Sequence, residues 1–177
     1  MILTILLVIV ALIVLVLIIA RFTGKSYDVV RQVTINRPKE EVFTYLKHIK
    51  NQDYFNKWTM TDPQMKKTFT GTDGTIGFIY AWDGNKKAGK GEQEIKNLVD
   101  GEKIDTEVRF EKPFEAVAQT PFILTSNAAG QTTVTWSMHS SMKYPMNAML
   151  LFMNMDKLLG KDMEWSLARL KELLEQK

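Results

Sequence analysis

The feature that most constrains this chain is the run of residues 2–20, which has no charged side chain and only one polar one, Thr4. At 1.5 Å per residue, a helix of this length covers about 28 Å, close to the roughly 30 Å hydrocarbon thickness of a bilayer. A helix that is apolar on every side needs protein or lipid all around it, and a chain of 177 residues has too little interior to enclose one. The run therefore predicts a transmembrane anchor over residues 1–21.

A cleaved signal peptide is the alternative to an anchor. No Lys or Arg precedes the run, the run exceeds the usual signal core of about 7–15 residues, and residues 17–20 lack a small-x-small cleavage pattern. These features favour an uncleaved anchor. Arg21, Lys25 and Arg31 follow it, so the positive-inside rule predicts a single-pass membrane protein whose soluble domain is cytoplasmic.

The composition after the anchor is that of an ordinary globular domain. The 23 basic and 20 acidic side chains, with a net charge of +3, are interspersed, which indicates a solvated surface and no nucleic-acid partner. The absence of cysteine excludes a disulfide framework and fits a reducing compartment. We expect a short linker over residues 22–26 and one domain over residues 27–177.

The first part of this domain has strand and then helix patterning. Residues 27–35 alternate between apolar and polar side chains, which predicts a strand. Arg31 interrupts its apolar face, and this points to a carboxylate partner or a ligand head group. Asn36 or Arg37 is the expected cap of a helix of about 11 residues that begins at Pro38.

Residues 64–140 alternate short strands with turn dipeptides such as Asp73-Gly74, Asp83-Gly84 and Asp100-Gly101. Each strand has one apolar and one polar face, which is typical of an antiparallel sheet that is covered on one side.

The C-terminal part supplies the cover. Apolar side chains recur there at i, i+4, i+7 and i+11, which predicts one face of a long helix: Met163, Leu167, Leu170 and Leu174. Gly160 is expected to separate this helix from a helical stretch over residues 147–157. The order of elements predicts an α+β fold, with a curved antiparallel sheet of about seven strands wrapped on the long C-terminal helix.

Several short motifs carry a resemblance to a known family. They are Val33–Phe43, Trp58, Gly74-x-x-Gly77, Trp82–Asn85, Gly89-x-Gly91-x-Gln93-x-Ile95, Thr132-x-Val134-x-Trp136 and Leu167-x-x-Leu170-Lys171. Over residues 27–175 the chain resembles the START-like (SRPBCC, helix-grip) superfamily, specifically its polyketide cyclase/dehydrase-type branch. The anchor is an addition to the typical soluble member. The resemblance implies a cavity between the sheet and the long helix that holds lipids, sterols, hormones or polyketides.

Large, deformable side chains at inward positions fit such a cavity, because methionine and aromatic side chains accept irregular apolar ligands. The candidate cavity residues are Phe78, Tyr80, Trp82, Phe110, Phe122, Trp136, Met138, Met149, Phe152 and Met153. The same side chains also fit a simple packed core, and both interpretations stay open. Residues 149–155 are the candidate gate of the cavity.

Catalytic chemistry has little support in the sequence. There is no thiol nucleophile, His48 and His139 are the only histidines, and no spacing suggests a metal site, so we expect no catalytic residues, metal or cofactor. Carboxylates buried in a cavity could act as general bases, and Glu92, Glu94 and Asp83 are the candidates.

Three hypotheses on function follow. The first is a non-enzymatic, membrane-anchored protein that binds a small hydrophobic ligand, such as a lipid or an isoprenoid- or polyketide-like molecule. The second is a cyclase, dehydratase or hydrolase that uses a cavity carboxylate or tyrosine. The third is an interaction or regulatory domain with a filled core, similar to stress-response members of the superfamily. An ionisable group in the cavity with a displaced pKa would favour the enzyme, whereas a wall of apolar atoms would favour the binding protein.

Overall fold

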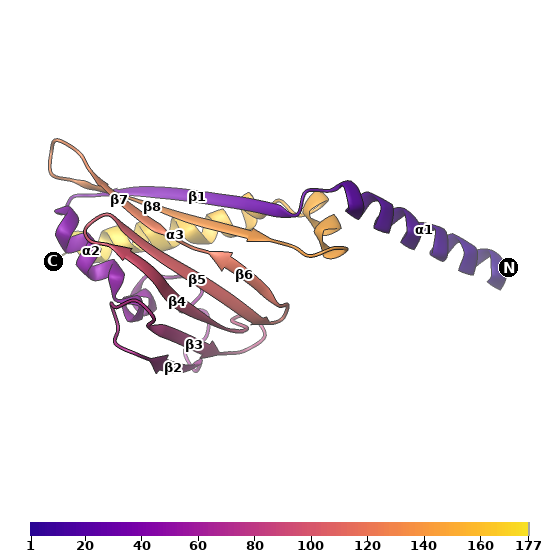
Figure 1. The fold of residues 1–177 in the computed structure, drawn as a ribbon, viewed down its shortest axis with the longest axis horizontal. Helices are drawn as coiled ribbons and strands as arrows, with labels where there is room; N and C mark the ends of the chain where they lie inside the picture. Colours follow the sequence, from indigo (N-terminus) through magenta and orange to yellow (C-terminus); the bar gives the residue numbers. More distant parts are fainter. Residues whose placement is uncertain (177) are drawn as a thin grey trace.

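The computed structural model describes residues 1–176. Its elements are, in chain order, α1 (Ile2–Phe22), β1 (Ser26–Ile35), α2 (Lys39–Lys47), the 3₁₀ helix η1 (Ile49–Tyr54), β2 (Lys66–Thr70), β3 (Ile79–Asp83), β4 (Lys90–Val99), β5 (Lys103–Lys112), β6 (Ala116–Gln119), β7 (Phe122–Ser126), β8 (Thr132–Ser141), the 3₁₀ helix η2 (Met146–Leu151) and α3 (Met155–Glu175). Figure 1 shows that α1 projects from one end of the globular part, which contains all the other elements.

The strands form one antiparallel sheet. The sheet has eight strands in the order β1-β8-β6-β5-β4-β3-β2, and β7 pairs with both β5 and β8. β1 and β8 pair along their whole length, from Ser26 opposite Ser141 to Ile35 opposite Thr132. The α+β, helix-grip architecture is confirmed, with one strand more than the approximate number expected.

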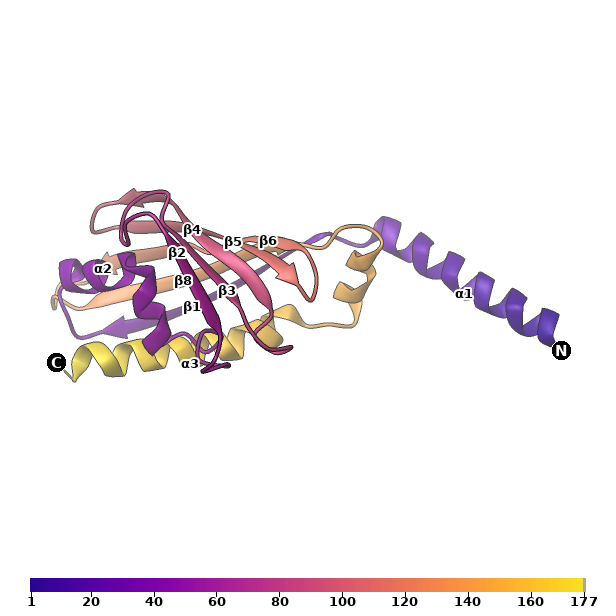
Figure 2. The same cartoon turned by 90° about the horizontal axis from the view of Figure 1, so that it is seen from below.

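The long helix α3 covers one face of this sheet and runs beside β1 (Figure 2). The helix face predicted from the apolar spacing is the buried one, since its four members are at most 6% exposed: Met163, Leu167, Leu170 and Leu174. They pack into the main core with residues of β1, α2, β7 and β8. The hydrophobic effect of this contact is what holds the sheet curved around the helix.

Three local predictions differ from the structure. Gly160 does not interrupt a helix, because α3 is continuous from Met155 to Glu175. The predicted helix over residues 147–157 is instead the short η2, followed by Asn154, whose side chain accepts a hydrogen bond from the Lys157 amide and caps α3. The helix α2 has 9 residues and its cap is Pro38, so it begins at Lys39.

Among residues 1–176, α1 is the one helix long and apolar enough to cross a membrane. A signal sequence meets the same criteria of length and composition. The C-terminal turn of α1 is the part that contacts the rest of the protein, since Ala20 is the buried residue of this helix.

Candidate functional site: a hydrophobic cavity

A cavity of about 250 Å³ lies between the inner face of the sheet, the segment around η1 and the first turns of α3. Its apolar wall consists of Tyr27, Trp58, Met65, Tyr80, Trp82, Ala88, Val108, Phe110, Pro113, Trp136, Met138, Met155 and Leu159. Its polar wall residues are Gln52, Asn56, Thr59, Lys87, Gln93, Lys112 and Thr120, with Gly89 beside them. The strands place these side chains there because alternate residues of each strand point to the same face.

The structure brings half of the predicted cavity residues together at this wall: Tyr80, Trp82, Phe110, Trp136 and Met138. Phe78 and Phe122 lie on the same side of the sheet but are buried in its apolar clusters. Met149, Phe152 and Met153 lie outside the cavity, in and just after η2, where Phe152 is 88% exposed.

Sequence reasoning missed several wall residues. Tyr27 was visible as the first apolar position of the β1 alternation, and Trp58 stood among the family motifs. Met155 was the last residue of the candidate gate and Leu159 follows it by one helical turn. Only the contact between α3 and the sheet shows that this turn faces the cavity.

The aromatic side chains of the wall hold one another in place. Trp136 stacks on Phe122, with ring centroids 5.0 Å apart, and meets Trp58 edge-on at 5.7 Å. Trp82 meets Phe110 at 6.1 Å in the same edge-on manner. Such pairs each add about 0.5–1.5 kcal/mol beyond burial, so the wall is formed before a ligand enters.

Gly91 explains how the Trp82 ring fits against β4. A Cβ at Gly91 would lie 2.5 Å from the Arg109 carbonyl oxygen and 2.8 Å from the Trp82 ring. The Trp82 indole in turn donates a hydrogen bond to the Ala88 carbonyl at 3.1 Å. The glycine therefore leaves the space that the ring occupies at the cavity wall.

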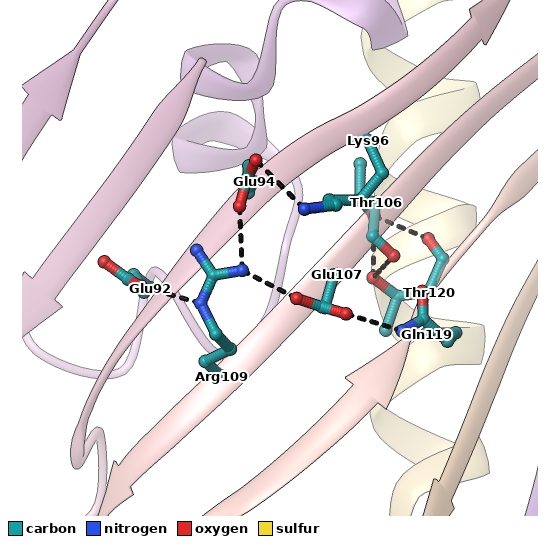
Figure 3. A network of polar contacts seen from close by, with 8 residues as sticks. All are labelled: Glu92, Glu94, Lys96, Thr106, Glu107, Arg109, Gln119 and Thr120. Atoms are coloured by element: carbon teal, nitrogen blue, oxygen red, sulfur yellow. Dashed lines mark hydrogen bonds and ion pairs between the residues drawn. The ribbon is translucent and has the colours of Figure 1, made fainter. Parts of the chain in front are cut away.

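The polar groups of the inner face satisfy one another, with one exception. The Gln93 amide donates to the Thr106 hydroxyl at 3.2 Å. The Thr106 hydroxyl contacts the Thr120 hydroxyl at 2.7 Å (Figure 3). The exception is the indole Nε1 of Trp136, which is buried without a hydrogen-bond partner among residues 1–176. A buried donor is costly to leave unpaired, and because this nitrogen has almost no accessible surface, a ligand in the cavity as it stands does not reach it.

Tyr80 is the most deeply buried ionisable side chain of the wall, at 2% exposed. Its hydroxyl donates to Asp53 Oδ1 at 2.7 Å, and Lys67 Nζ lies 2.8 Å from the other oxygen of that carboxylate. Burial, followed by the hydrogen bond to Asp53, raises the pKa of the Tyr80 phenol far above its ordinary value. The phenol therefore stays protonated and is a poor general base.

The candidate general bases face away from the cavity. Glu92 and Glu94 lie on the outer face of the sheet with Glu107, and all three bind Arg109 at 2.6–2.8 Å (Figure 3). The Arg109 guanidinium is the main cause that lowers the pKa of the Glu94 carboxyl, whereas the hydrogen bond from Gln119, followed by the one from Arg109, lowers the pKa of the Glu107 carboxyl. These carboxylates are ion-pair partners of an arginine on the outer face, and none of them reaches a ligand in the cavity.

The remaining candidate groups also lie elsewhere. Asp83 is exposed at the end of β3, His139 lies 2.7 Å from Asp28 on the sheet exterior, and His48 follows α2. In the described part of the chain no Asp, Glu or His lines the cavity, and no group of three potential metal ligands comes together.

The cavity rim and the apolar helix α1 share one end of the molecule. The β3–β4 turn, which contains Lys87, the end of β5 at Lys112 and the start of α3 lie at the end from which α1 departs (Figures 1 and 2). Tyr27 of the wall follows the end of α1 by only a few residues.

Comparisons with known proteins agree with this geometry. A sequence model of the family "Polyketide cyclase / dehydrase and lipid transport" matches residues 26–175. The chain therefore belongs to this family, within the START-like (SRPBCC) superfamily. No curated protein sequence matches the chain.

Solved structures share the fold at low sequence identity. Norcoclaurine synthase from Thalictrum flavum is 8% identical with a TM-score of 0.63, over 90% of this chain and 92% of that one. Ara h 8.0201 is 9% identical with a TM-score of 0.56, over 86% and 99%. An uncharacterised protein from Rhizobium leguminosarum is 12% identical with a TM-score of 0.56, over 86% and 97%.

Proposed function

We propose that this protein is a membrane-anchored, non-enzymatic binding protein for a small hydrophobic ligand, such as a lipid or an isoprenoid- or polyketide-like molecule. The observation that carries the proposal is the cavity wall, which is mostly aromatic, methionine and aliphatic. Membership of a family described as polyketide cyclase, dehydrase and lipid transport supports the same class of ligand.

The cavity size and its polar groups limit the ligand. A volume of about 250 Å³ is slightly below the range of about 300–1,000 Å³ typical of sites for drug-sized molecules. It suits one ring system or one apolar chain, with any larger part of the ligand at the rim beside Lys87 and Lys112.

The enzyme hypothesis has weaker support. One similar structure is named a synthase, so the fold admits catalysis. The ionisable wall residues of this chain are two tyrosines and two lysines, Tyr27, Tyr80, Lys87 and Lys112. None is a carboxylate, and Tyr80 is held protonated. The interaction-domain hypothesis is disfavoured because it requires a filled core.

Anchoring is proposed on the basis of α1 and the charges that follow it. The helix is apolar up to its last turn, which contains Arg21. Lys25 follows three residues after the helix ends. These basic residues favour a cytoplasmic domain. Protease treatment of intact cells should leave the C-terminus uncut, and digestion from outside would contradict this orientation.

A cavity-filling variant tests ligand binding. Val108 lies on the cavity wall, so Val108→Trp should fill the space, whereas Val117→Trp adds the same ring on the exposed face of β6. Lipids would be extracted from the full chain and from both variants and identified by mass spectrometry. Lipids that merely surround α1 should be equal in all three samples.

We expect a cavity ligand to be present in the wild type and in Val117→Trp, and at least tenfold depleted in Val108→Trp. The fluorescence of N-phenyl-1-naphthylamine, titrated in nanodiscs with empty discs subtracted, should follow the same order. Identical lipids in all three proteins, together with identical probe binding, would contradict the proposal.

A further inference from the structure

The segment that joins β8 to α3 is fastened to the end of the membrane helix. Asn147 of η2 is 0% exposed, and its side-chain amide donates to the Ala20 carbonyl at 2.7 Å and to the Thr23 carbonyl at 3.0 Å. Carbonyls at a helix C-terminus have no partner within the helix, so a buried amide that binds them fixes the direction in which α1 leaves the domain.

Around this buried amide, the segment over residues 142–153 exposes large apolar side chains. They are Tyr144, Met146, Met149, Leu151 and Phe152, which are 47%, 44%, 37%, 55% and 88% exposed. Several such side chains within one short segment are unusual on a water-soluble surface, where exposed apolar residues are scattered singly. Because the same segment holds α1, this apolar patch is continuous with the apolar surface of the helix.

The charges within the two stretches that form this surface are all of one sign. Residues 21–25 and 142–153 contain Arg21, Lys25 and Lys143 and no acidic residue. The two stretches are neighbours, since the Met142 amide donates to the Lys25 carbonyl at 2.8 Å. A surface with exposed apolar side chains and basic residues is the combination that binds the headgroup region of an anionic bilayer.

We propose that residues 142–153 lie in the headgroup region of the same bilayer that α1 crosses. The domain then contacts lipid through both α1 and residues 142–153, so its orientation does not depend only on the short stretch between α1 and β1. This inference rests on the proposed anchoring. Continuity with α1 and the uniform positive charge favour lipid over a second copy of the chain or another protein.

The position of the segment has a consequence for the cavity. Phe152 precedes Met155 of the cavity wall by three residues, so the lipid-bound segment leads directly into the first turn of α3. Held in this way, the rim formed by that turn faces the bilayer surface. A hydrophobic ligand would pass between membrane and cavity without crossing bulk water.

Site-directed quenching in the full chain tests the proposal, because the chain contains no native cysteine. Single cysteines would replace Phe152 in the patch, Val10 in α1 and Ala128 in the turn between β7 and β8. That turn lies at the opposite end of β8 from η2. Each would carry a bimane label in vesicles of phosphatidylcholine and phosphatidylglycerol that contain lipids spin-labelled near the headgroup or deep in the acyl chain.

We expect the Val10→Cys label to be quenched most by the deep spin label and the Phe152→Cys label most by the shallow one. The Ala128→Cys label should be quenched by neither. If Phe152→Cys behaves like Ala128→Cys while Val10→Cys is quenched, the interfacial proposal fails and the anchor stands. An unquenched Val10→Cys would overturn both.

Access to an aqueous quencher separates lipid from protein as the occupant. A label at position 152 that is shielded from iodide, but not quenched by either lipid, would indicate a protein contact and would contradict the proposal. Asn147→Ala should reduce shallow quenching at least twofold in the Phe152→Cys chain, and in the Val10→Cys chain it should leave deep quenching unchanged. The mapping with the three cysteines needs no change at Asn147, so the proposal stays testable if that variant does not fold.

Discussion

The guanidinium of Arg31 on β1 lies directly on the backbone of α3 at Gly160. A Cβ at Gly160 would be 2.0 Å from Arg31 Nη2. Asp156 and Glu164, one turn before and after the glycine, hold the guanidinium, with Nη1 2.8 Å from Asp156 Oδ1 and Nε hydrogen-bonded to Glu164. The Arg31 side chain lowers the pKa of the Asp156 carboxyl. Gly160 thus makes room for the contact that fixes the first half of α3 to β1.

Gly160→Ala should therefore change the free energy of unfolding, and the sign of the change should depend on whether Arg31 is present. In the wild type the added methyl group displaces the guanidinium. We expect the free energy of unfolding to fall by about 1–2 kcal/mol, because hydrogen bonds to charged groups contribute about 1.5–3 kcal/mol and both carboxylates are more than half exposed. In an Arg31→Met background no guanidinium is displaced. The better helix propensity of alanine should then raise the free energy of unfolding by up to about 1 kcal/mol. Urea unfolding followed by tryptophan fluorescence would measure all four proteins. Destabilisation by the same amount in both backgrounds would contradict the contact.

The Arg31–Gly160 contact also shows where sequence reasoning stops. An isolated glycine in a helical pattern reads as a break, because its low helix propensity is visible in the sequence and the arginine that needs the space is far away in the chain. The sequence did show that Arg31 was exceptional on its strand and that a carboxylate was one possible partner. Which carboxylates bind it depends on how α3 crosses β1, and that is a tertiary property.

The cavity shows the same division. Period-2 patterning correctly grouped Tyr80 with Trp82 and Trp136 with Met138, because alternation along a strand is local. It could not separate the residues of the wall from Phe122, which stacks behind Trp136. Met149 and Phe152 lie elsewhere, in and just after η2, which packs against α1.

The cluster around Arg109 predicts a stability that depends on pH. The Arg109 guanidinium lowers the pKa of Glu94 below the ordinary 4.5, and the Gln119 amide followed by the Arg109 guanidinium lowers that of Glu107. A carboxyl with a lowered pKa stabilises the folded protein above its unfolded-state pKa, and this contribution is lost as the pH falls through its folded-state value. Stability should therefore decline below about pH 4.5 in the wild type.

Removal of the guanidinium should change that profile. Arg109→Gln leaves Glu92, Glu94 and Glu107 side by side without their cation, so we expect a loss of about 2 kcal/mol at pH 7. Protonation relieves the repulsion, so the difference from the wild type should shrink as the pH falls toward 3. Thermal unfolding from pH 3 to 8 would measure this difference in stability. Arg169→Gln, which removes a surface pair with Glu172, is the control. A difference that is constant with pH would show that the carboxylates are not coupled to Arg109.

Tyr80→Phe separates a structural hydroxyl from a catalytic one. The variant removes the bond to Asp53 but leaves the Asp53–Lys67 ion pair and the ring at the cavity wall. We expect a loss of about 1 kcal/mol of stability, as for a typical hydrogen bond, and probe binding within about threefold of the wild type. A product formed from the co-purified ligand by the wild type, but not by Tyr80→Phe, would revive the enzyme hypothesis with Tyr80 as its acid.

Gly91→Ala tests whether the Trp82 ring depends on the space at Gly91. The new methyl group would meet the Arg109 carbonyl, which belongs to the backbone of β5 and cannot move aside without disturbing the sheet. It would also push the Trp82 ring into the cavity. Overpacking of this kind costs about 1–3 kcal/mol, so we expect a loss of about 2 kcal/mol of stability and weaker binding of N-phenyl-1-naphthylamine.

Gly24→Ala is the matched control, because nothing lies within 4 Å of its Cβ and the change in stability should stay within about 0.5 kcal/mol. If Gly91→Ala lowered stability but left probe binding unchanged, Trp82 would belong to the sheet packing alone and not to the surface that contacts the ligand.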